Sequence, residues 1–71
     1  MEFTWESGFE IHVSVQEDGA TLISANRQGL VSLANHLLAL SMEKPGEHFH
    51  LDEHNALEDG SNELIVELVE G

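Results

Sequence analysis

The spacing of apolar residues changes twice along this sequence, and these changes constrain the fold more than any other feature. From Phe9 to Val15 apolar residues alternate with polar ones, which is the two-residue period of a half-buried strand. After Asn26 the period lengthens to about 3.6 residues, and alternation returns after Gly46. A chain with this pattern combines strands with a helix.

The residues before Asn26 are predicted to form a β-hairpin. Its first strand covers Phe9 to Val15, and Asp18-Gly19 supplies the turn that leads into a second strand around Thr21 to Ser24. Further upstream, Phe3 and Trp5 are at odd-numbered positions, like the apolar residues of the first strand. They could therefore extend that strand or cover an edge of the core.

A helix is predicted from about Arg27 to Glu43, with Asn26 as its N-cap and Pro45 as the residue that prevents its continuation. Its apolar residues occupy an arc of roughly 200°. They are Leu30, Val31, Leu33, Ala34, Leu37, Leu38, Leu40 and Met42. The rest of the helix circumference carries Ser32, Asn35, His36 and Glu43. One sheet face usually covers less than such an arc, so either the sheet curls around the helix or part of the arc meets a second protein.

Two further strands are predicted, from Glu47 to Asp52 and from Glu63 to Val69. The order ββαββ predicts one α+β domain, residues 1–71, with a mainly antiparallel four-stranded sheet and one helix packed on one face. A chain of 71 residues buries only about 60% of the surface that its unfolded form exposes. Self-association or binding to a partner would stabilise such a small domain, so a homodimer is one possibility.

The charge is strongly unbalanced, with 14 Asp and Glu against Arg27 and Lys44, for a formal net charge of −12. Such a surface repels nucleic acid and anionic membranes and attracts basic proteins. Solubility alone requires less acidity than this. We therefore expect a basic protein partner, with no nucleic acid and no membrane.

The sequence predicts a soluble, cytoplasmic protein. It has no cysteine, which fits a reducing compartment, and MEFTWESGFE lacks the basic and apolar regions of a signal peptide. The apolar stretch from Leu30 to Met42 falls short of the roughly 20 residues that span a bilayer.

Three histidines and an aspartate gather in the short stretch HFHLDEH. On a strand, residues two apart point the same way, so a His-x-His pair with a carboxylate can hold zinc. The candidate ligands are His48, His50, Asp52 and His54. We favour a solvated sheet face whose histidines pair with glutamates of the next strand, and we expect no metal or cofactor. A small metal-binding protein is the alternative function.

No residue pattern indicates catalysis. The serines have no placed His and Asp partners, and Gly29 is a single glycine that does not form a phosphate-binding loop. His12 and His36 are predicted to lie at the surface or at the edge of the core. We expect a protein that is not an enzyme and has no catalytic residues.

The segments NRQGLVSLANHLLALS and HFHLDEHNALEDGSNELIVE resemble the small bacterial immunity proteins of polymorphic toxin systems, in particular the immunity protein 32 family. The resemblance covers roughly residues 20 to 69. Its discriminating parts are His50-Leu51-Asp52 and Gly60-Ser61 followed by Glu63-Leu64-Ile65. The resemblance implies a protein that is made with a toxin and neutralises it by binding. It identifies no catalytic or metal-binding residues.

Together with the charge, an immunity role predicts binding to a basic, nuclease-type toxin domain, whose cleft an acidic surface can occlude by mimicking phosphate. Loops displayed on a rigid sheet commonly carry recognition. The acidic residues around the loop between the third and fourth strands are therefore the predicted partner-binding residues: Asp52, Glu53, Glu58, Asp59 and Glu63.

Overall fold

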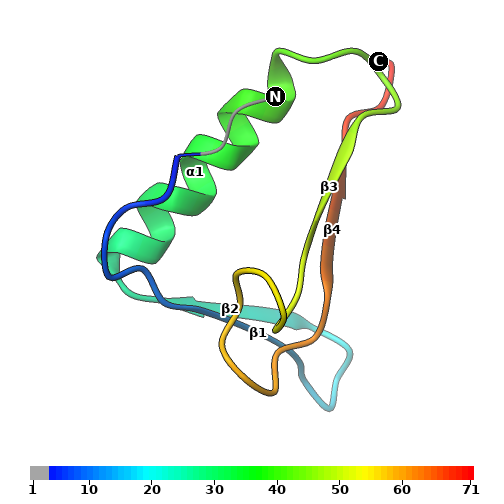
Figure 1. The fold of residues 1–71 in the computed structure, drawn as a ribbon. Coiled ribbons are helices and arrows are strands. Elements are labelled where there is room, and N and C mark those ends of the chain that lie inside the picture. The colour runs from blue at the N-terminus through cyan, green and yellow to red at the C-terminus, as the bar shows by residue number, and fades with distance from the viewer. Residues whose placement is uncertain (1–3) are drawn as a thin grey trace.

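The computed structural model describes residues 4–71, so the predicted role of Phe3 lies outside the described residues. Along the chain, the elements are β1 (Ile11–Val15), β2 (Thr21–Ala25), α1 (Arg27–Ser41), β3 (His48–Leu51) and β4 (Leu64–Glu67) (Figure 1). The α+β class, the order ββαββ and the single helix are confirmed. In Figure 1 the helix and the two hairpins lie as three sides of a triangle around the core.

The strands form two antiparallel pairs, β1 with β2 and β3 with β4, so the predicted single four-stranded sheet is wrong. The loop between β3 and β4, rather than another strand, borders the second edge of β1. Its Glu58 N–H donates to the carbonyl of Ile11 at 2.9 Å, and its Asn62 N–H donates to that of Val13 at 2.7 Å. Because this segment turns at Gly60, which has a φ of 84°, it does not continue as a strand along β1.

The core lies between the hairpins and the helix. Its buried apolar residues come from β1, α1, β3 and the loop after β3, and they are Ile11, Val13, Leu40, Phe49, Leu51 and Leu57. Trp5 is partly buried at the edge of this core and stacks on Phe9, with ring centroids 4.5 Å apart. A turn at Ser7-Gly8 separates Trp5 from β1, so of the two predicted roles it covers the core and does not extend the strand.

The helix packs through a face that the apolar pattern did not indicate. The buried residues of α1 are Gly29, Ser32, His36 and Leu40. Most of the predicted apolar arc instead faces away from the core, with Leu30 54% and Leu38 62% exposed. The sheet therefore does not curl around the helix. The prediction that His36 lies at the surface or the core edge is also wrong, because its side chain is fully buried.

Close approach of the helix to β1 explains this orientation. A Cβ atom at Gly29 would overlap the carbonyl oxygen of Glu10 and lie 3.0 Å from a side-chain carbon of Ile11. The predicted N-cap at Asn26 is confirmed, since its Oδ1 accepts the Gly29 N–H at 2.8 Å. The same oxygen accepts the Glu10 N–H at 3.0 Å, so one side chain both caps the helix and ties it to the start of β1.

The His36 ring is part of the core. It packs against Trp5 with ring centroids 4.0 Å apart and lies edge-on to Phe49 at 5.7 Å. Its Nδ1 lies 2.7 Å from the carbonyl oxygen of Ser32, and because a carbonyl can only accept, Nδ1 carries the hydrogen. Burial lowers the pKa of His36 below its ordinary value of 6.5, although the hydrogen bond to Ser32 opposes this effect.

Replacing Gly29 by alanine should destabilise the protein, even though alanine is favoured over glycine within helices by about 1 kcal/mol. The overlap with the Glu10 carbonyl should displace α1 from β1 and lower the free energy of unfolding by about 1–3 kcal/mol. Urea denaturation measures this change. The matched control, Gln28→Ala at an exposed helical position, should change stability by less than about 0.5 kcal/mol. Unchanged or higher stability of Gly29→Ala would contradict the close approach.

The buried His36 should make stability depend on pH. Its folded-state pKa is lowered, so the unfolded chain binds a proton more readily between that pKa and 6.5. The contribution of neutral His36 is complete above about pH 6.5 and is lost as the pH falls towards the folded-state pKa. From about pH 7 to about pH 5, wild type should therefore lose stability relative to His36→Met.

Urea midpoints of both proteins at the two pH values measure this difference. His54→Met is the control for the loss of a histidine, because the His54 side chain is 86% exposed and lies outside the core. Parallel pH profiles of wild type and His36→Met would contradict the buried, neutral imidazole.

Candidate functional site

The segment of residues 52–63, called here the β3–β4 loop, is fixed to the rest of the fold. Besides the two backbone hydrogen bonds to β1, its Ser61 Oγ accepts the Val13 N–H at 3.2 Å, and its Leu57 is buried in the core. The Asn55 side chain of the loop also donates to the carbonyl of His50 in β3 at 3.0 Å. These contacts position the acidic residues that the sequence indicated.

Two of the five predicted partner-binding carboxylates hold the loop itself. Asp52 accepts the His54 N–H at 2.9 Å, and Glu53 accepts the Gly60 N–H at 2.8 Å. Glu58, Asp59 and Glu63 are exposed, and Glu63 also lies 3.4 Å from Nδ1 of His50. Asp52 and Glu53 thus shape the loop, and Glu53 is also exposed, as Glu58, Asp59 and Glu63 are.

The histidines of β3 lie on its solvent-exposed side, as predicted. His48 stands opposite Glu67, and His50 stands opposite Ile65 and contacts Glu63. The carboxylate of Asp52 turns into its own loop. In residues 4–71, no group of three or more His, Asp or Glu side chains converges on a position for one ion. The alternative set of His48, His50, Asp52 and His54 is therefore not preassembled as a ligand cluster.

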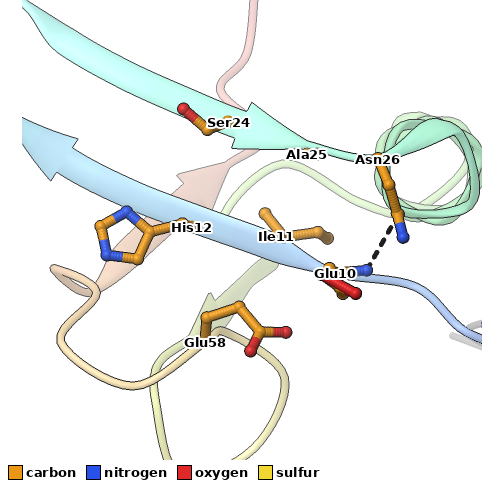
Figure 2. A pocket seen from close by; sticks show the side chains of 7 residues that line it. All are labelled: Glu10, Ile11, His12, Ser24, Ala25, Asn26 and Glu58. Carbon is orange, nitrogen blue, oxygen red and sulfur yellow. Dashed lines mark hydrogen bonds between the residues drawn. The ribbon is translucent and has the colours of Figure 1, made fainter.

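An open pocket of about 320 Å³ lies where β1 begins and where β2 leads into α1 (Figure 2). Its lining comes from β1, β2, the helix N-cap and the β3–β4 loop, and consists of Glu10, Ile11, His12, Ser24, Ala25, Asn26 and Glu58. In Figure 2 the Glu58 side chain approaches β1 from the loop, near Glu10 and His12, and the dashed line marks the bond from Glu10 to Asn26.

This pocket combines apolar carbon with carboxylates. Ile11 is buried and Ala25 is half-buried, whereas Glu10 and Glu58 are exposed. Such a lining suits a long basic side chain, whose methylene groups can lie on carbon while its cationic end meets a carboxylate. Glu58 was among the predicted partner-binding residues. Sequence reasoning missed that Glu10 and His12 line the same pocket, because contacts between the β3–β4 loop and β1, which are distant in sequence, place them there.

In residues 4–71, no helix combines the length and the apolar character needed to cross a membrane.

Comparison with known proteins identifies the family. The profile of the family described as Immunity protein 32 matches residues 20–69, a range that includes β2, α1, β3, β4 and the whole β3–β4 loop. β1 and Glu10 lie before the matched range. A search of curated proteins found no match. A search of solved structures also found none. Since the matched residues make up more than half of the sequence, this chain belongs to the immunity protein 32 family.

Proposed function

We propose that this protein is a non-enzymatic immunity protein that binds a cognate toxin of a polymorphic toxin system and neutralises it in the cytoplasm of the producing cell. Membership of the immunity protein 32 family carries this proposal. The charge of −12 adds the expectation that the toxin domain is basic, as the clefts of nuclease-type toxins are.

The proposed binding surface joins the pocket to the displayed carboxylates of the β3–β4 loop. Glu58 belongs to both, since it lies in the loop and lines the pocket. Asp59 and Glu63 add exposed carboxylates in the same loop, while Asp52 and Glu53 keep the loop in shape. A basic side chain of the toxin would enter the pocket between Glu10 and Glu58.

The anchoring of the loop favours such a role. A loop that is already fixed by hydrogen bonds and by the buried Leu57 loses little conformational freedom when a partner binds. Carboxylates at the rim then act mainly on the rate of encounter, whereas those enclosed with a cation in the pocket act mainly on the rate of release. The pocket should therefore set specificity.

Neutralising the pocket by Glu10→Gln with Glu58→Gln should weaken toxin binding by about tenfold or more, because a cation would be left without its partners. Both side chains are exposed, so the fold should be retained. Calorimetric titration with a catalytically inactivated form of the toxin encoded beside this protein measures the effect. Glu17→Gln with Glu70→Gln removes the same charge from exposed positions outside the pocket and is the matched control. Equal weakening by both pairs would exclude the pocket as the specific site.

Salt should act mainly on association. Ions screen attraction beyond a Debye length of about 8 Å at physiological strength, so added salt should lower the association rate much more than it raises the dissociation rate. Stopped-flow binding at several salt concentrations measures both rates.

The decisive experiment is co-expression with the toxin. If cells die equally with and without this protein, and no complex forms at low salt, the immunity proposal is wrong.

A further inference from the structure

The outward side of α1 carries an apolar surface that the fold leaves uncovered. This surface, called here the exposed helix face, consists of Leu30, Val31, Ala34, Leu37 and Leu38, all of which are exposed. Single exposed aliphatic residues are ordinary on a protein surface, but a contiguous group of this size on one helix indicates an interaction site.

The spacing of this face has two-fold symmetry. Relative to Ala34, Leu30 and Leu38 lie four positions away in opposite directions, and Val31 and Leu37 lie three positions away. In a two-fold dimer each contact between two different residues occurs twice, and this spacing would pair apolar residues with apolar residues in both copies of each contact. In an antiparallel pair of helices with the axis at Ala34, Leu30 would meet the partner's Leu38. The small alanine at the axis would let the helices approach closely.

The distribution of charge permits a second copy to bind at this helix. The chain has 14 acidic residues, but none of them lies in α1, whose sequence is RQGLVSLANHLLALS. Two molecules that each carry a charge of −12 would meet with least repulsion on this helix. Antiparallel packing would also place the exposed Arg27 near the C-terminal end of the partner helix, where the helix dipole attracts a cation.

We propose that two copies of this chain associate through their exposed helix faces, with the α1 helices antiparallel and a two-fold axis at Ala34. The surface proposed for the toxin is chemically different, since its carboxylates lie in the pocket and the β3–β4 loop. Gly29, which contacts β1, lies on a different side of α1 from Ala34. Self-association is therefore a property separate from toxin binding.

Sedimentation analysis of the full chain at micromolar concentrations should show a dimer. Ala34→Glu should weaken it by about tenfold or more, because two like charges would face each other at the axis. Gln28→Glu adds the same charge at an exposed helical position outside the exposed helix face and should leave the dimer intact. Circular dichroism should show the same helix content in both variants. A wild-type monomer, or equal dissociation by both substitutions, would overturn the proposal.

Crosslinking tests the position of the axis. The chain contains no cysteine, so Ala34→Cys introduces a single thiol whose copies would face each other at the axis. Mild oxidation should join this variant into a covalent dimer, because a disulfide needs Cα atoms within about 7 Å. Gln28→Cys should stay unlinked. A wild-type monomer whose toxin complex is abolished by Ala34→Glu would instead assign the exposed helix face to the toxin.

Discussion

The contact between the backbone at Gly29 and the start of β1 sets the orientation of the helix, and much of the structure depends on it. Only a residue without a side chain can lie against the Glu10 carbonyl, and Asn26 fixes the same junction through hydrogen bonds to both partners. With Gly29 turned inward, the helical period also turns Ser32 and His36 inward. The same junction forms one wall of the pocket, through Ala25 and Asn26.

Burying polar residues in so small a core is tolerable because they are hydrogen-bonded. The Ser32 hydroxyl accepts the Glu6 N–H at 2.8 Å, and the Ser32 carbonyl lies 2.7 Å from the His36 ring. If the opposite side of α1 faced β1, Leu30 and Leu37 would hold the helix further away. The fold thus gains a close helix–strand contact and leaves apolar surface outside, which a chain of 71 residues can bury against a second molecule.

The sequence could predict what depends on local spacing. The strands, the helix, the Asn26 cap and the outward position of His48 all follow from periodicity and capping chemistry. Periodicity also shows which residues share a side of α1, but it does not show which side meets the core. That choice depends on contacts between distant segments. So do the division into two hairpins and the placement of Glu10 and Glu58 in one pocket, in particular on the hydrogen bonds from the β3–β4 loop to β1.

The two proposed surfaces differ in physical character, so added salt should affect binding at each of them in opposite directions. Attraction between the carboxylates around Glu58 and a basic toxin acts over a long range, so screening weakens it. Between two copies of this chain the long-range force is repulsive, because each carries a charge of −12. Screening therefore removes an obstacle to contact through the exposed helix face while the burial of Leu30 and Leu38 still favours it. One change of ionic strength thus shifts the balance from charge-driven recognition towards apolar self-association.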